Sequence, residues 1–183
     1  AGHKNMLQLI ELRWIAVIGQ VTTIAVAILL FGIALPLVHM LQVLSCLIAF
    51  NIASHLRWHE RRPVSNGEMF MAILVDVSSL TVLLYLSGGT TNPFAFLYLL
   101  QVIVSAVLLE VLWTWSIVVI TITCMAGLAA FAEPLPLPFD HERGIGSLYV
   151  QGLLVCFALN AGLLVLFISR ISDNVRDKAT QLA

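Results

Sequence analysis

The sequence predicts an all-α integral membrane protein, a bundle of six transmembrane helices with both termini in the cytoplasm. The first observation is composition: 60% of the 183 residues are hydrophobic and 10% are charged, whereas soluble domains carry about 25% charged residues. The mean hydropathy is +1.00. The second observation is a set of six apolar runs, each about long enough to cross a bilayer. The third is the one-sided distribution of lysine and arginine.

The first three helices are predicted from apolar runs that polar segments separate. A hydrocarbon core about 30 Å thick needs roughly 20 residues of helix, at about 1.5 Å per residue. The runs over residues 14–35, 36–56 and 69–87 have about this length. Pro36 marks the turn between the first two runs, and two glycines follow the third directly.

The last three helices are predicted over residues 93–109, 113–132 and 148–169. Only a short turn around Glu110 separates the fourth helix from the fifth, so this boundary is the least sharply defined. The fifth helix ends before an extended, proline-rich segment at residues 133–138.

Basic residues predict the orientation, because cytoplasmic loops carry an excess of Lys and Arg. In a six-helix topology, eight of them fall on the side that holds both termini: Lys4, Arg13, Arg57, Arg61, Arg62, Arg170, Arg176 and Lys178. Only Arg143 falls on the other side. A count of five or seven helices would scatter these residues, so the pattern favours six helices and cytoplasmic termini.

The topology divides the chain into a cytoplasmic N-terminal segment (1–13), a six-helix transmembrane domain (14–169) and the start of a cytoplasmic signalling helix (170–183). Apolar residues recur every three or four positions along this last part: Ile168, Ile171, Val175, Ala179 and Leu182. Such a stripe could begin a parallel dimeric coiled coil. An amphipathic tail that frays would show the same pattern, so both interpretations stay open.

Several function classes find no support in the sequence. The net charge is −1, and no basic stretch is interleaved with aromatic residues, which argues against nucleic-acid binding. The cysteines lie singly inside apolar runs and form no CxxC pair: Cys46, Cys124 and Cys156. His55 and His59 have the spacing of half a zinc site but lack a convincing third ligand. We therefore predict no metal, no haem and no catalytic residue in this chain.

The most informative segment is the glycine-rich loop that follows the third predicted helix. Gly88 and Gly89 lack side chains, so their amides can approach a flat ligand closely. Asn92 is a good N-cap, Pro93 suits the first helical position, and Phe94 adds an aromatic face. A ring that carries carbonyl groups could accept hydrogen bonds from these amides or from Asn92 and stack on Phe94. A tight turn followed by a capped helix would have the same residues, and the two interpretations do not exclude each other.

The heptapeptide GGTTNPF at residues 88–94 resembles the GGxxNPF motif of RegB-type sensor histidine kinases, also called PrrB or ActS. In that family the motif lies in the periplasmic loop between the third and fourth of six transmembrane helices. Hydropathy and charge place the loop at the same position here. The resemblance extends to the preceding run at residues 83–86, to the six-helix layout and to the charged helix after the last span.

This resemblance implies a sensor domain of the bacterial inner membrane that binds ubiquinone or a related quinone. The quinone site would consist of the residues at the fixed motif positions: Gly88, Gly89, Asn92, Pro93 and Phe94. Thr90 and Thr91 occupy the variable positions and carry over less directly. Tyr98 and Gln101 lie beyond the motif on the fourth helix, where they could line a pocket below the loop.

The kinase region of that family has no counterpart in the sequence, which contains neither a phospho-accepting histidine motif nor glycine-rich nucleotide boxes. The resemblance thus implies that this part of the protein is not an enzyme, although the full-length protein would be a histidine kinase. It also implies as partners the membrane lipid, the quinone, a second copy in a homodimer and a cytosolic response regulator.

Asp76 is the only acid well inside a predicted helix, and a buried acid in lipid is costly enough to suggest a function. It shares a helix face with Ser79, Leu83 and Ser87, which leads toward the glycines. However, it lies twelve residues before Gly88, about 18 Å along a helix axis, so direct contact with the ring is not expected. Interhelical hydrogen bonding, coupling of protonation to signalling and a dimer contact remain as its possible roles.

The main alternative function is a small polytopic transporter or channel-like protein. Such folds often show inverted repeats, broken helices and several polar residues along a path, whereas the sequence shows no internal repeat. A membrane enzyme would need a serine–histidine pair or a cluster of acids at one depth, and neither is evident. A structural dimerisation module is the third alternative, but no GxxxG motif occurs in the helices.

Overall fold

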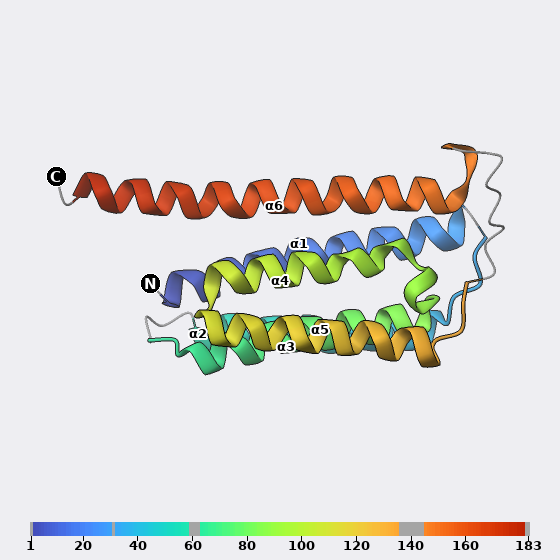
Figure 1. Ribbon diagram of the computed structural model, residues 1–183, viewed down its shortest axis with the longest axis horizontal. Helices are drawn as coiled ribbons and strands as arrows, with labels where there is room; N and C mark the ends of the chain where they lie inside the picture. Colours follow the sequence, from blue (N-terminus) through green and yellow to red (C-terminus); the bar gives the residue numbers. More distant parts are fainter. Residues whose placement is uncertain (1, 31, 59–62, 136–144, 182–183) are drawn as a thin grey trace. The chain divides into compact units, whose positions relative to one another are not determined.

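The computed structural model describes residues 2–30, 32–58, 63–135 and 145–181. The chain forms two compact units, Ala1–Pro136 and Leu137–Ala183, which we describe separately. Within the described ranges every regular element is a helix. The all-α prediction is therefore confirmed (Figure 1). The basic residues Arg61, Arg62 and Arg143, which entered the topology prediction, lie outside the described ranges.

Helix α1 (Gly2–Leu29) starts at Gly2 rather than at residue 14, and ends at Leu29 rather than at residue 35. The prediction missed its start because the first turns are polar in composition. An inward-facing stripe at helical spacing continues through them, and each member is buried: Met6, Leu9, Ile10, Arg13 and Val17. The helix ends early because Gly32 has a φ of 62°, a left-handed conformation that terminates helices. The predicted boundary at residue 13 is thus not a boundary of the helix.

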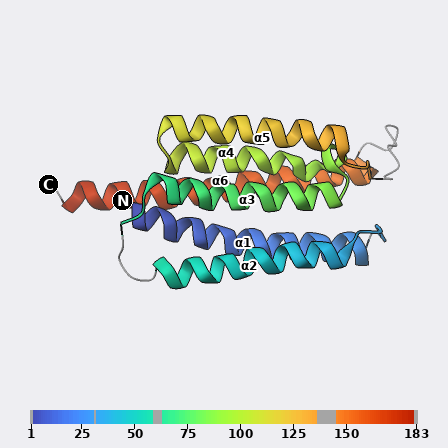
Figure 2. The same ribbon diagram turned by 90° about the horizontal axis from the view of Figure 1, so that it is seen from below.

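Helix α3 (Asn66–Leu86) is the central element of the first unit. A capping box starts it: the Ser65 hydroxyl accepts a hydrogen bond from the Glu68 amide, and the Glu68 carboxylate accepts one from the Ser65 amide. The helix lies between α1 and α2 (Leu37–Trp58) on one side and α4 (Leu97–Leu108) and α5 (Val111–Phe131) on the other (Figure 2). Its Ile73 and Val77 are completely buried.

The chain between α3 and α5 combines two short 3₁₀ turns with one α-helix. Two 3₁₀ turns, η1 (Gly89–Thr91) and η2 (Pro93–Phe96), precede helix α4 (Leu97–Leu108). Helix α5 (Val111–Phe131) follows after an extended break at Glu110, which confirms the predicted boundary there. The fourth predicted helix therefore begins as a 3₁₀ turn.

The second unit contains helix α6 (Leu148–Gln181), a single helix of 34 residues. The helical continuation beyond residue 169 is therefore confirmed. Most side chains of the predicted stripe lie outside the described residues, so the coiled coil stays a prediction.

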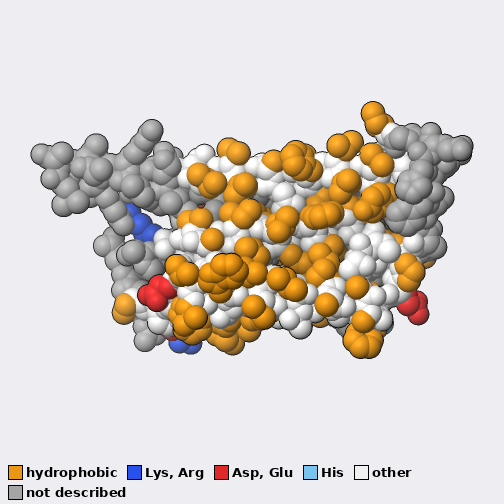
Figure 3. All heavy atoms as spheres, viewed as in Figure 1, with side chains coloured by type: hydrophobic (Ala, Val, Ile, Leu, Met, Phe, Trp, Pro, Cys, Tyr) orange, Lys and Arg blue, Asp and Glu red, His pale blue; other side chains and the backbone are white. Residues whose placement is uncertain are grey.

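The lengths and compositions of the helices fit a membrane protein. Four described helices are long and apolar enough to cross a bilayer, and two shorter apolar helices cover Pro93–Leu108 and Tyr149–Gly162. Hydrophobic side chains spread over the displayed face, whereas the coloured acidic and basic side chains lie toward its ends (Figure 3). Large apolar residues of α5 such as Leu112, Val119 and Phe131 are exposed, as lipid-facing residues should be. The cytoplasmic location of the termini stays a prediction.

Candidate functional site

The GGTTNPF loop begins where α3 ends, at Ser87. Gly88 has a φ of 105° and Gly89 a φ of 57°, conformations that residues with a Cβ rarely adopt. The loop therefore needs glycine at both positions to leave the helix axis so sharply. The end of α5 lies at the same end of the bundle (Figure 1) and contacts η1.

The space left by the missing side chains is filled by residues that follow α5. A Cβ placed on Gly88 would lie 2.4 Å from Cγ of Leu135, and one on Gly89 would lie 2.4 Å from Cβ of Ala132. The glycines thus permit close packing within the protein. The ligand approach that the sequence suggested would require another direction or a displacement of Leu135.

Asn92 acts as the predicted N-cap, and Pro93 occupies the first position of η2. The Asn92 Oδ1 accepts a hydrogen bond from the Phe94 amide at 3.0 Å. Its Nδ2 donates to the carbonyl oxygen of Ser87 at 3.1 Å and to the Ser87 hydroxyl at 2.9 Å. The side-chain donors that the sequence analysis offered to a quinone carbonyl are therefore engaged in closing the loop.

Thr91 ties the loop to the segment after α5. Its hydroxyl donates to the carbonyl oxygen of Gly88 at 2.7 Å and accepts a hydrogen bond from the Leu135 amide at 3.0 Å. Thr90, in contrast, is exposed. The two variable positions of the motif thus differ, because one holds the loop in place and the other faces outward.

The loop retains hydrogen-bond donors of its own. Within the described part of the chain, the backbone N–H groups of Gly88, Gly89 and Thr90 donate to no acceptor. Unpaired backbone donors in an apolar environment are costly and call for a partner. These three consecutive amides are donors of the loop without a partner among the described residues; Gly88 and Gly89 are buried, and Thr90 is exposed.

The predicted pocket residues below the loop are partly engaged. The hydroxyl groups of Tyr98 and Thr81 lie 2.6 Å apart, which joins the first turn of α4 to α3, and Tyr98 is buried. Phe94 and Gln101 are partly buried. The Tyr98 hydroxyl therefore serves helix packing in this structure.

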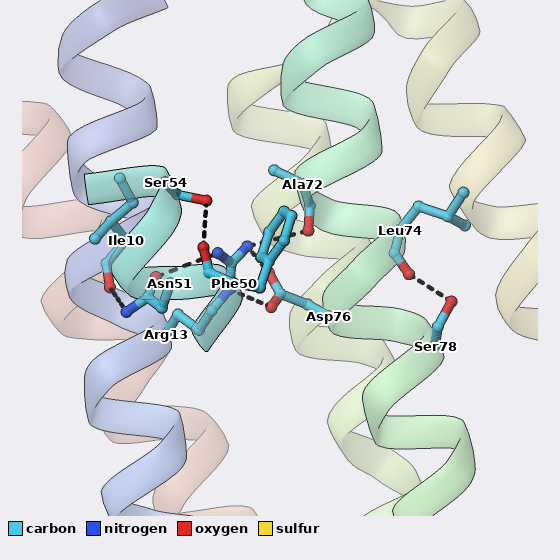
Figure 4. Close-up of polar contacts among 9 residues, drawn as sticks. All are labelled: Ile10, Arg13, Phe50, Asn51, Ser54, Ala72, Leu74, Asp76 and Ser78. Carbon is cyan, nitrogen blue, oxygen red and sulfur yellow. Dashed lines mark hydrogen bonds and ion pairs between the residues drawn. The ribbon is translucent and has the colours of Figure 1, made fainter. Parts of the chain in front are cut away.

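Asp76 belongs to a separate polar cluster, which joins α1, α2 and α3 (Figure 4). Arg13 donates to Oδ1 of Asp76 from Nε at 2.5 Å and to Oδ2 from Nη2 at 2.9 Å. The same guanidinium donates to Oδ1 of Asn51 at 3.2 Å and to the carbonyl oxygen of Ala72 at 3.1 Å, and lies 4.9 Å from the ring centroid of Phe50.

Asp76 forms interhelical hydrogen bonds, which is one of the roles predicted for it. Its partner, Arg13, was not predicted. Arg13 is the last residue of the predicted cytoplasmic segment, and its exposed fraction is 3%. In the sequence, the burial of Arg13 is indicated by its position in the apolar stripe of α1. Nothing in the cluster reaches the loop, so the structure separates Asp76 from the proposed quinone residues.

Replacing Asn92 by alanine is expected to destabilise the protein by about 1–2 kcal/mol, because it removes an N-cap and both bonds to Ser87. Asn92→Asp should cost less, since it keeps the acceptor for the Phe94 amide. Unfolding in mixed micelles would measure both. The exposed Thr90→Ala should stay within about 0.5 kcal/mol. Equal stability of Asn92→Ala and Thr90→Ala would contradict the capping role.

Comparison with known proteins adds an independent observation. Residues 5–171 match the family model described as the PilS-like transmembrane domain, a six-helix domain. The chain is 30% identical over 180 residues to the sensor histidine kinase RegB of Cereibacter sphaeroides. This alignment covers 96% of the chain and 39% of the relative, so the chain spans about two fifths of that protein. No solved structure matches the chain.

Proposed function

Since the chain belongs to the family of PilS-like transmembrane domains and is the membrane sensor domain of a RegB-type protein of the bacterial inner membrane, we propose that it reports the redox state of the quinone pool. In this proposal, ubiquinone or a related quinone binds at the loop between α3 and α4. The membership in this family argues for the sensor and against the transporter or channel that the sequence had left as the alternative.

The observation that carries the proposal is the set of three consecutive amides at Gly88, Gly89 and Thr90, in a loop with the GGxxNPF motif. A quinone carries carbonyl oxygens, which only accept hydrogen bonds, whereas the hydroxyl groups of its reduced form donate them and are weaker acceptors. Backbone N–H groups can only donate. The loop therefore favours the oxidised form, and such a difference in binding free energy is what a ligand needs to shift a conformational equilibrium.

Exposed apolar residues of η2 and α4 offer a path from the bilayer toward the loop. Phe96 and Leu99 are exposed there, next to the partly buried Phe94. A lipid-soluble head group can reach the loop along this apolar surface without leaving the membrane. Phe94 supplies an aromatic face for stacking with the ring.

Helix α6 is suited to carry the signal out of the membrane. Its 34 residues span about 51 Å at 1.5 Å per residue, more than the roughly 30 Å of a hydrocarbon core. We propose that it continues into a cytosolic kinase region of the full-length protein. The other proposed partners are a second copy in a homodimer and a response regulator that the kinase would phosphorylate.

Photocrosslinking tests the quinone site. The chain is reconstituted in nanodiscs with an azido-ubiquinone analogue, illuminated, and mapped by mass spectrometry with and without excess ubiquinone. We expect an adduct at residues 88–94 that ubiquinone competes away and that Asn92→Ala weakens, because this variant opens the loop. The control is Gly19→Ala in α1, where an added Cβ meets nothing within 4 Å. Absence of a competed adduct in folded protein would refute the proposal.

A further inference from the structure

We propose that Leu135 and the quinone head group compete for the same face of the glycine loop, so that Leu135 is the latch that bound quinone opens. This inference rests on the proposed function, because it specifies how the ligand at that loop changes the protein. It adds a residue outside the motif, on the segment that follows α5.

The Leu135 side chain covers Gly88 closely. A Cβ on Gly88 would lie 2.4 Å from Cγ, 2.7 Å from Cδ1 and 3.0 Å from Cβ of Leu135. Non-bonded carbon atoms essentially never approach each other this closely, so even a methyl group does not fit between the two residues. A flat ring can therefore lie on this face of Gly88 only after Leu135 has moved away.

The latch lies on an extended segment beyond the end of α5. Helix α5 ends at Phe131, the backbone of Ala132 is extended, and Glu133 and Pro134 are exposed. Leu135 is half-buried, and its amide makes one hydrogen bond, to the Thr91 hydroxyl at 3.0 Å. Opening thus breaks this hydrogen bond and the apolar contact with Gly88, while the ring restores apolar contact with the loop and accepts hydrogen bonds from its amides.

In the sequence, the latch lies between the loop and helix α6. Along the chain, the segment after Leu135 leads to Leu148, where α6 begins. Thr91 joins the loop to the first part of this connection, since it holds the Gly88 carbonyl and the Leu135 amide with one hydroxyl. Displacement of Leu135 therefore breaks the hydrogen bond through which the Thr91 hydroxyl joins the loop to the segment after α5.

Cysteine labelling tests the displacement directly. Leu135→Cys is made in a chain whose native cysteines, Cys46, Cys124 and Cys156, are replaced by alanine, and the protein is reconstituted in nanodiscs. A short-chain ubiquinone should raise the rate of maleimide labelling at position 135 by roughly tenfold, because it shifts the latch from mostly closed to mostly open. Glu133→Cys, two residues earlier and already exposed, should react at the same rate with and without ubiquinone.

Competition binding supplies the second arm. In the azido-ubiquinone assay, Leu135→Ala should bind ubiquinone more tightly than the unsubstituted chain, by up to about tenfold, and Leu135→Val should show a smaller gain. The latch proposal is refuted if ubiquinone leaves the labelling rate unchanged, or if Leu135→Ala binds ubiquinone with unchanged affinity. The quinone site is still supported in that case if ubiquinone competes the adduct away. Absence of a competed adduct in every variant overturns both.

Discussion

Replacing Asp76 by asparagine is expected to destabilise the helix bundle by about 3 kcal/mol, because the substitution leaves the Arg13 guanidinium charged and buried without its carboxylate. The double variant Arg13→Met/Asp76→Leu should be close to the original protein in stability. Both charges are then gone, and apolar side chains of similar volume replace a pair whose desolvation offsets much of its attraction. Arg13→Met alone should resemble Asp76→Asn, since it leaves an unpaired carboxylate.

Unfolding of these variants in mixed micelles would measure the effect, and a double-mutant cycle would isolate the coupling between the two residues. Ser78→Ala is the matched control on the same helix. Its hydroxyl is exposed and bonds only to the Leu74 carbonyl one turn earlier (Figure 4), so its cost should stay within about 0.5 kcal/mol. Two results would contradict a stabilising Arg13–Asp76 ion pair. In the first, Asp76→Asn lowers the free energy of unfolding as little as Ser78→Ala does. In the second, the double variant is the least stable of all.

The same variants separate stability from ligand binding. Asp76 precedes Gly88 by twelve residues, about 18 Å along the helix, and its hydrogen bonds run to α1 rather than to the loop. Folded Asp76→Asn should therefore bind quinone with nearly unchanged affinity. A large loss of affinity would mean that the ligand reaches deeper into the bundle than the loop.

Replacing Gly89 by alanine is expected to cost about 2–5 kcal/mol, from two sources. A positive φ of 57° costs a residue with a Cβ roughly 1–2 kcal/mol. Overpacking typically costs another 1–3 kcal/mol, and here the new Cβ would lie 2.4 Å from Cβ of Ala132 and 3.3 Å from the carbonyl oxygen of Leu128. The backbone contact with α5 limits how far the neighbours can retreat.

Two further variants show which source dominates. Gly89→Ala/Ala132→Gly removes the side-chain clash and should recover stability in part, while the cost of the backbone conformation remains. Gly127→Ala lies inside α5, where the added Cβ meets nothing within 4 Å, and should stabilise the protein by about 0.5–1 kcal/mol. Thermal or denaturant unfolding would rank the three variants. If Gly89→Ala were as stable as Gly127→Ala, the close packing at Gly89 would be disproved.

The helices that the sequence predicted best are those whose boundaries local chemistry marks. Helix α5 was expected over residues 113–132 and occupies Val111–Phe131, because Glu110 and the proline-rich exit interrupt the apolar run on both sides. The cap at Asn92 and the position of Pro93 were likewise readable, since an N-cap depends on neighbouring residues alone. The motif and the apolar runs also identified the family that the comparisons show.

Contacts between distant parts of the chain were decided only by the tertiary structure. Arg13 and Asp76 are 63 positions apart, and Thr91 and Leu135 are 44 apart. The sequence marked Asp76 as unusual and the glycines as places of close approach, but hydropathy and spacing do not say which side chain fills a given space. Charge counting used Arg13 only to assign a side of the membrane, because it weighs a residue by type and by position along the chain. Helix formation depends on local patterns, whereas the pairing of buried polar groups and the filling of a glycine face depend on which helices pack together.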